Sequence, residues 1–183
     1  MKKAAIFSLL LVSPAFLAHA ASDYAGEETR AIKALSPERL QGLGDGAGLG
    51  YAKAAELNGY PGPAHVLEHA QALHLSGPQL NAVQAIHARM RAAAIKSGEA
   101  FIAAERALEA AFASGGAGPE QIDRLAADAG RAEARVRASH LKAHIETTAV
   151  LTRHQIERYR ELRGYGQPNR QHGHGGGHGR HNH

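Results

Sequence analysis

The stretch SGGAGP, residues 114–119, decides the predicted fold because it is a short break between two long helical segments. Glycine is favoured just past the end of a helix, and proline is favoured at the first position of the next one. We therefore predict that one helix ends near residue 113 and that another begins at Pro119. Helices joined by so short a connection pack as antiparallel neighbours. The predicted fold class is all-α, with a long antiparallel helical hairpin.

Both segments repeat apolar residues every three or four positions, which is the pattern of a helix with one buried face. Many of these positions are alanine, which indicates close helix approach and a thin core. A thin core favours dimerisation, so we expect a homodimer. The predicted buried stripes consist of Leu80, Val83, His87, Met90, Ala94, Phe101, Ala104 and Leu108 in residues 79–113, and of Ile122, Leu125, Ala129, Val136, His140, His144 and Thr147 in residues 119–150.

Two further stretches, LSGPQL (75–80) and LTRHQI (151–156), carry the same signal for the start of a helix. In each, a hydroxyl accepts from the backbone N–H three residues later, and the glutamine there reaches back to the N–H of the cap. The leucine before each cap forms a hydrophobic staple with the following turn. LSPERL (35–40) has the staple and the cap but carries Arg39 in place of glutamine. The residues of the two complete motifs are Leu75, Ser76 and Gln79, and Leu151, Thr152 and Gln155.

The first twenty residues, MKKAAIFSLLLVSPAFLAHA, are organised like a secretory signal peptide. Lys2 and Lys3 precede an apolar run, and the final Ala-His-Ala fits a cleavage site. The apolar run is too short for a comfortable membrane span. We predict a signal peptide at residues 1–20, a mature chain beginning at Ala21 and a periplasmic location. An uncleaved membrane anchor is the alternative.

The mature chain divides into three predicted segments. Residues 21–62 contain glycine-rich breaks such as GLGDGAGLG, which predict an irregular N-terminal arm with short helices. Residues 63–164 are helical almost throughout, with shorter helices capping the hairpin. Residues 165–183 are a glycine- and histidine-rich tail that has nothing to bury, so we predict that the tail is disordered.

The composition narrows the function classes. The 183 residues contain no cysteine, which excludes disulfides and thiolate chemistry, whereas 13 histidines are the strongest bias. Removal of the two signal-peptide lysines lowers the formal net charge from +4 to +2. This charge is too small and too dispersed to indicate binding of nucleic acid. No segment after the signal peptide is apolar enough to cross a membrane, so we expect no membrane insertion of the mature chain.

A capped L-[TS]-x-x-Q motif that occurs twice, around a long helical hairpin and behind a signal peptide, resembles the Spy/CpxP family. The resemblance covers roughly residues 62–164. The family contains periplasmic refolding chaperones, zinc-resistance-associated proteins and heavy-metal sensors. The resemblance implies a small all-helical fold that dimerises into a shallow curved cradle. It also implies that unfolding clients are held without ATP.

The metal-sensing branch of this family binds its ion between helices, through a histidine pair, an acidic residue, and a histidine with a methionine. The matching positions fall near His65 and His69, near His87, and near His144 with Thr147. His87 stands where the family has a carboxylate, and Thr147 stands where the family has a methionine.

The residues themselves also indicate a metal site, because two histidine pairs have members four positions apart. Residues at this spacing are neighbours on one helix face, so both imidazoles of a pair could reach one zinc ion. Such nitrogen ligands favour zinc, with nickel or copper possible, and Glu68 and Glu146 are the nearest carboxylates. The alternative is that these histidines are core residues hydrogen-bonded to their neighbours. The predicted interhelical ligands are His65, His69, His87, His140 and His144.

The tail carries a second set of histidines, separated mostly by glycine. Several could converge on one zinc, nickel or copper ion, with an affinity that rises above the imidazole pKa near 6.5. The alternative is a solvated tail without function. The predicted tail ligands are His172, His174, His178, His181 and His183.

The stretch HVLEH, residues 65–69, also fits the inverted H-x-x-E-H pattern of zinc proteases. That chemistry needs a further protein ligand and a water-activating pocket on a substantial scaffold. The motif lies on a short predicted helix with no substrate-binding strand beside it. We therefore predict that the chain is not an enzyme.

The arginines of the hairpin could line a basic concave face suited to acidic or unfolded clients. The alternative is that they are solvated and paired along their own helices, as Glu133 with Arg137 would be. The candidate client-binding residues are Arg89, Arg91, Arg131 and Arg135.

These observations together predict a periplasmic stress protein that acts as an ATP-independent holding chaperone for unfolded periplasmic proteins. We expect it to bind a divalent transition metal, zinc above all, through its histidines. The alternative is a heavy-metal sensor or metal buffer that signals to a membrane sensor or regulator and has no chaperone activity.

Overall fold

The computed structural model describes residues 22–165, and this part of the chain contains helices and no strand. The prediction of an all-helical protein with a long helix pair and shorter helices is therefore confirmed. The predicted signal peptide and the tail histidines lie outside the described residues. The helices are α1 (Pro37–Asp45), α2 (Lys53–Leu57), α3 (Pro63–Glu68), α4 (Gly77–Ala113), α5 (Pro119–Val150) and α6 (Arg153–Leu162).

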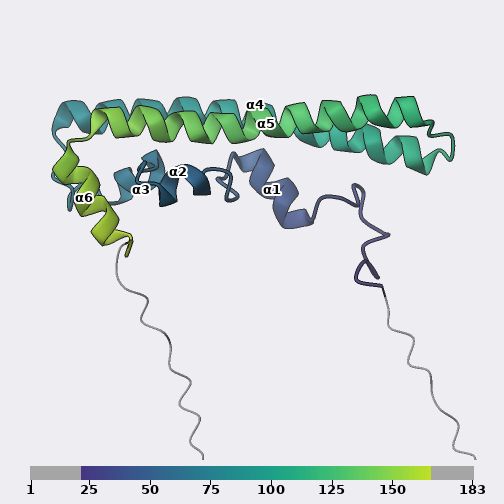
Figure 1. The fold of residues 1–183 in the computed structure, drawn as a ribbon, viewed down its shortest axis with the longest axis horizontal. Helices are drawn as coiled ribbons and strands as arrows, with labels where there is room; N and C mark the ends of the chain where they lie inside the picture. Colours follow the sequence, from purple (N-terminus) through teal and green to yellow (C-terminus); the bar gives the residue numbers. More distant parts are fainter. Residues whose placement is uncertain (1–21, 166–183) are drawn as a thin grey trace, which may run out of the picture.

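Helices α4 and α5 form the long axis of the molecule and lie side by side (Figure 1). Residues 114–118 connect one pair of ends, and Gly115 adopts the left-handed backbone conformation that the turn requires (φ 70°). At the opposite ends, the side-chain amide of Gln79 donates to the carbonyl of Val150 over 3.0 Å. The two helices therefore run in opposite directions.

The buried faces of α4 and α5 follow the predicted stripes closely. Helix α4 buries Val83, Ala94 and Phe101 as predicted, together with Ile86, Gly98 and Ala111. The remaining predicted positions of both helices are half-buried. Helix α5 buries Ala129, Ala132, Val136, His140, Ala143, His144 and Thr147.

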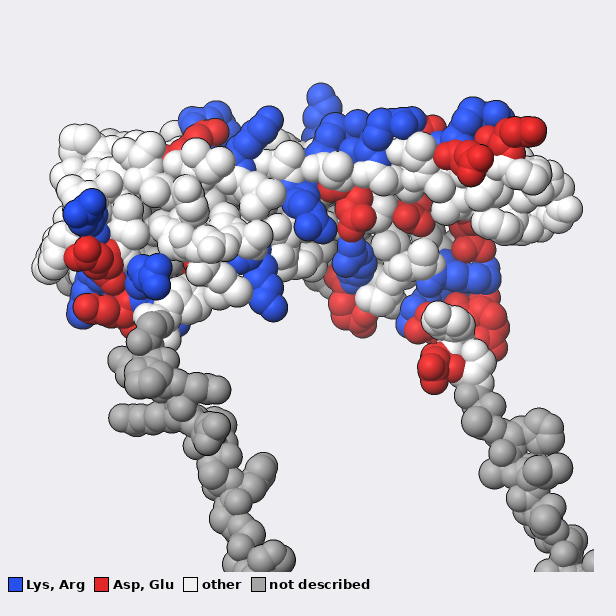
Figure 2. Space-filling model, viewed as in Figure 1, with Lys and Arg blue, Asp and Glu red and all other residues white. Residues whose placement is uncertain are grey.

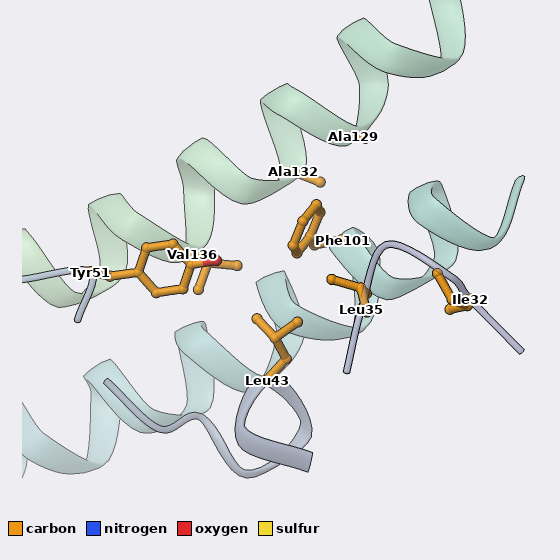
Figure 3. Packing of buried hydrophobic residues seen from close by; sticks show 8 residues of the cluster. All are labelled: Ile32, Leu35, Leu43, Tyr51, Phe101, Ala129, Ala132 and Val136. Atoms are coloured by element: carbon orange, nitrogen blue, oxygen red, sulfur yellow. The ribbon is translucent and has the colours of Figure 1, made fainter. Parts of the chain in front are cut away.

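The segment predicted as an irregular N-terminal arm supplies half of the main core cluster. Helices α1, α2 and α3 lie along one side of the long pair (Figure 1). Helix α1 crosses α4 at Gly98, where an added Cβ would lie 2.4 Å from the carbonyl oxygen of Leu43. The helix pair alone would leave this face exposed, so the arm completes the fold. The cluster contains Ile32, Leu35, Leu43 and Tyr51 from the arm and Phe101, Ala129, Ala132 and Val136 from the long helices (Figure 3).

A second core cluster lies at the end of the molecule where α6 turns back beside α3 (Figure 1). Leu75, the predicted staple residue before α4, and Ile156 in the first turn of α6 pack against this cluster half-buried. The cluster therefore fixes the direction in which the chain enters α4 and leaves α5. Its buried members are Val66, Leu73, Val83, Leu151 and Tyr159.

Both predicted capping boxes are present, and their glutamines also bind each other. The side chains of Ser76 and Thr152 accept from the backbone N–H of Gln79 and Gln155, and each glutamine accepts from the N–H of its cap. The two side-chain amides then donate to each other over 2.9 and 3.1 Å. Gln155 also donates to the carbonyl of Leu73 over 3.2 Å. The two motifs are thus one structural unit that joins the starts of α4 and α6.

Candidate functional site

A pocket of about 550 Å³ lies between the N-terminal arm and the α4–α5 pair. Four of the predicted metal-binding histidines line it: His65 from α3, His87 from α4, and His140 and His144 from α5. The glycine-rich stretch at residues 46–50 forms another wall. The fold therefore brings histidines from three helices around one space.

His144 is buried, and its ring orientation is set by the connection between α2 and α3. Its Nδ1 lies 2.7 Å from the carbonyl oxygen of Tyr60. Because a carbonyl only accepts, Nδ1 carries a proton, and the other ring nitrogen of a neutral imidazole keeps its lone pair. The ring lies directly against Gly62, where an added Cβ would meet the ring atoms Cε1 and Nε2 at 2.8 Å. Only glycine leaves room for this ring.

His140 is more deeply buried, with 3% of its surface exposed, and stacks on the ring of Tyr51 at a centroid distance of 6.3 Å. Burial, and secondly the charge of His144, lower the pKa of His140 below its ordinary value. Its Nε2 atom is buried without a hydrogen-bond partner. A buried polar atom without a partner costs free energy, so this nitrogen is disposed to bind a ligand.

Glu56 of α2 also lines the pocket, and its two oxygens have different surroundings. Oε1 accepts from the hydroxyls of Tyr159 (2.6 Å) and Tyr165 (3.1 Å) and from Nε of Arg163 (3.3 Å). Oε2 is buried without a hydrogen-bond partner and lies 3.7 Å from Nδ1 of His144. Burial and the hydrogen bond to Glu56 raise the pKa of Tyr159.

The carboxylates suggested by the sequence lie elsewhere. Glu68 is mostly exposed and contacts Nδ1 of His65 over 3.1 Å, and this hydrogen bond is the main cause of its lowered pKa. Glu146 forms an exposed ion pair with Arg89 over 2.8 Å and does not line the histidine pocket. No local pattern distinguishes Glu56, because it reaches the pocket only when the arm folds back onto α5.

His69 is the one predicted interhelical ligand that does not line the pocket. Helix α3 ends at Glu68, and His69 is its C-terminal capping residue, followed by turns. His65 and His87 are half-buried and line the pocket, whereas His69 does not. Thr147, at the position where the resembled family has methionine, is fully buried and its hydroxyl oxygen has no partner.

Within residues 22–165, no group of three or more His, Cys, Asp or Glu side chains is arranged so that it could hold a metal ion. The pocket gathers such groups around one space without bringing them into a ligating arrangement. The donor set nevertheless fits a transition metal, because Nε2 of His140 and Oε2 of Glu56 are both buried and unpartnered. Imidazole and carboxylate ligands suit zinc, and imidazole also suits nickel and copper.

The four candidate client-binding arginines do not all line the same pocket. Arg89 and Arg135 line a second pocket of about 330 Å³ between α4 and α5, whereas Arg91 lines the histidine pocket. Arg131 pairs with Asp128 on its own helix. Charged groups of both signs cover the middle and the connecting end of the long pair, while the other end is mostly uncharged on this face (Figure 2).

Glu133 does not pair with Arg137, as the sequence had suggested. Its carboxylate binds Arg39 of α1 over 2.7 Å and accepts from the hydroxyl of Tyr51 over 2.9 Å. The guanidinium of Arg137 instead lies over the Tyr51 ring, 5.6 Å from its centroid. The Arg39 side chain, which replaces the glutamine of a capping box, thus helps to hold the arm against α5.

No helix in the described part of the chain is both long enough and apolar enough to span a membrane. Comparisons of the chain with known protein families, with curated proteins and with solved structures found no match.

Proposed function

We propose that the protein binds a divalent transition metal, zinc above all, in the pocket between the N-terminal arm and the α4–α5 pair. The observation that carries this proposal is the pair of buried, unpartnered ligand atoms, Nε2 of His140 and Oε2 of Glu56, in a pocket lined by four histidines. Since the described residues show no ready ligating group, side chains of the arm and of α5 must move together when the metal binds.

The residues that would hold the metal are His140 and His144 of α5, together with His87 and His65 on the neighbouring helices. The metal would supply positive charge and ligand bonds to groups that are costly to bury alone. His144 keeps its orientation through the carbonyl of Tyr60. Metal binding would therefore fasten the arm to the long helix pair.

We further propose that the molecule is a periplasmic holding chaperone that acts without ATP, as its resemblance to the Spy/CpxP family implies. The second pocket, between α4 and α5, supports this role, because Ile86, Met90 and alanines line it. Its basic side chains are Arg135, Lys142 and Arg89, and Arg89 pairs with Glu146. Ile145, which precedes the pocket residue Glu146 in the sequence, is 60% exposed. Such a surface could contact unfolded, acidic segments weakly and reversibly.

A metal sensor or buffer without client activity is the second candidate function. The pocket favours it, because its walls come from both the arm and the long helices, so metal would change how these parts are joined. The signal would then pass to a membrane sensor or regulator. The tail histidines would add loose metal binding in either role.

The metal proposal is tested by zinc titration calorimetry of the mature chain with the five tail histidines replaced by asparagine. We expect about one ion per chain, and we expect His140→Phe together with His144→Phe to abolish this binding. Gln84→Leu, an exposed change on α4, is the control. Absence of binding to the parent protein would refute the pocket as a metal site.

The choice between chaperone and sensor is tested by light scattering of a chemically denatured client, with and without zinc. A holding chaperone slows aggregation, and Arg89→Gln with Arg135→Gln weakens this effect. Arg131→Gln is the matched control, because Arg131, like Arg89, pairs with an acidic side chain but does not line this pocket. If the protein never slows aggregation, the sensor or buffer becomes the better conclusion.

We also propose that the protein is a homodimer, because α4 and α5 approach through alanine-rich faces and form a thin core. Sedimentation equilibrium at micromolar concentration measures the mass directly. A monomer across the concentration range would refute this proposal without affecting the metal site.

A further inference from the structure

We propose that Glu56 is the carboxylate ligand of the metal pocket and that Tyr159, Arg163 and Tyr165 hold it in position. This inference rests on the proposed metal-binding function and names a ligand that the sequence does not suggest. It also assigns a role to α6 and the residues just after it, which supply the groups that orient the ligand.

The two carboxylate oxygens of Glu56 differ in their hydrogen bonding. Oε1 accepts three hydrogen bonds from groups of α6 and the residues just after it, which fixes the direction of the carboxylate. Oε2 receives none, although it is buried. A buried carboxylate oxygen without a partner costs free energy that a cation would offset. A carboxylate fixed on one side and open on the other is suited to bind a metal ion.

The nearest side chains do not supply the missing partner. Nδ1 of His144 lies 3.7 Å from Oε2, which is too far for a hydrogen bond, and the same nitrogen is engaged with the carbonyl of Tyr60 at 2.7 Å. The Nε atom of Arg163 bonds to the other carboxylate oxygen. Glu56 lines the same pocket as His140 and His144, and we assign its unpartnered Oε2 to that pocket.

The two tyrosines and Arg163 correspond to the outer groups that orient metal-binding carboxylates in proteins. Removing such an outer partner lowers metal affinity by about 10–100-fold. The affinity of the pocket should therefore depend on α6, although α6 itself contributes no ligand. Because a ligand stabilises the state that binds it, metal in the pocket should in turn stabilise the packing of α6 against α2.

The test is zinc calorimetry on the full mature chain with its five tail histidines changed to asparagine. We expect Glu56→Gln to lower the association constant at least tenfold, because the amide keeps a hydrogen-bond acceptor but loses the negative charge. Glu120→Gln is the matched control and should leave the constant unchanged, since Glu120 is exposed in the first turn of α5 and does not line the pocket. Far-UV circular dichroism checks that each variant is folded.

Tyr159→Phe, which retains the ring and removes only the hydroxyl, is the second test variant. We expect about a tenfold loss of zinc affinity and a smaller zinc-dependent shift of the urea midpoint. If Glu56→Gln is unfolded, the Tyr165→Phe variant replaces it in the same comparison. Binding within twofold of the parent in these variants would overturn the role of Glu56, while the metal site would stand. No binding in the parent would overturn the metal site itself.

Discussion

Replacing Gln155 by leucine should reveal how strongly the two capping motifs support each other. Gln155 is 8% exposed, and its amide donates to the carbonyl of Leu73 and exchanges two hydrogen bonds with Gln79. It also accepts from the N–H of Thr152. Leucine keeps the volume but removes all of these bonds.

The expected loss follows from the groups that remain unpaired. A buried carbonyl left without its donor costs about 1–3 kcal/mol, and loss of the cap interaction adds about 0.5–1 kcal/mol. The free energy of unfolding should therefore fall by about 1.5–4 kcal/mol in Gln155→Leu. The side chain of Gln79 bonds to Ser76, Val150 and Gln155, but it is only half-buried, so water can replace part of these bonds and Gln79→Leu should cost about 1 kcal/mol.

The double variant tests the pairing itself. The mutual hydrogen bonds can be lost only once, so the double variant should be less destabilised than the sum of the single losses by about 1 kcal/mol. Urea unfolding followed by far-UV circular dichroism measures all four proteins. Gln84→Leu, on the exposed side of α4, is the control and should stay within about 0.5 kcal/mol of the parent. Losses that add within about 0.3 kcal/mol would refute the coupling of the two motifs.

Three further predictions concern glycine and histidine positions. Gly98→Ala should destabilise the protein by about 1–3 kcal/mol in urea, because its Cβ would lie 2.4 Å from a backbone carbonyl of α1. Gly130→Ala is the control, because its Cβ meets nothing within 4 Å, and its free energy of unfolding should rise by up to about 1 kcal/mol. Equal effects of the two substitutions would contradict the close crossing of α1 and α4. Gly62→Ala should displace the ring of His144 and weaken zinc binding in calorimetry, with retained affinity as the contrary result. Burial lowers the pKa of His140 in the folded state, so the unfolded chain binds the proton first as pH falls below 6.5. The metal-free protein should therefore lose stability between pH 7 and pH 5, and the His140→Phe variant should lose less. Thermal unfolding measures both. Parallel dependences of the melting temperature on pH in the two proteins would contradict this prediction.

Much of the fold was predictable because its signals are local. The Ser76–Gln79 and Thr152–Gln155 spacings mark helix starts through bonds within one turn, and Pro119 marks a third. The apolar stripes of α4 and α5 record which faces become buried, including His140 and His144. Each of these patterns depends on neighbours within a few residues, so each can be read before the chain is folded.

The packing of the N-terminal arm was not predictable in the same way. The glycine-rich composition of residues 42–50 indicates breaks, but it does not indicate that Leu43 and Tyr51 enter the main core. Gly98 lies inside a long helix where glycine is locally unfavourable. Its role appears only when α1 crosses α4 at that point.

The candidate site, like the fold, was predictable from the sequence only in part. The sequence by itself determined the all-helical class, the long helix pair, its two capping motifs and the histidines, because periodicity and capping act over one or two turns. Only the tertiary structure decided that His65, His87, His140 and His144 share a pocket, that His69 does not line it and that Glu56 does. Such contacts join residues as far apart as Glu56 and Tyr165. They depend on how the arm folds back onto the long helices, and no local pattern encodes that.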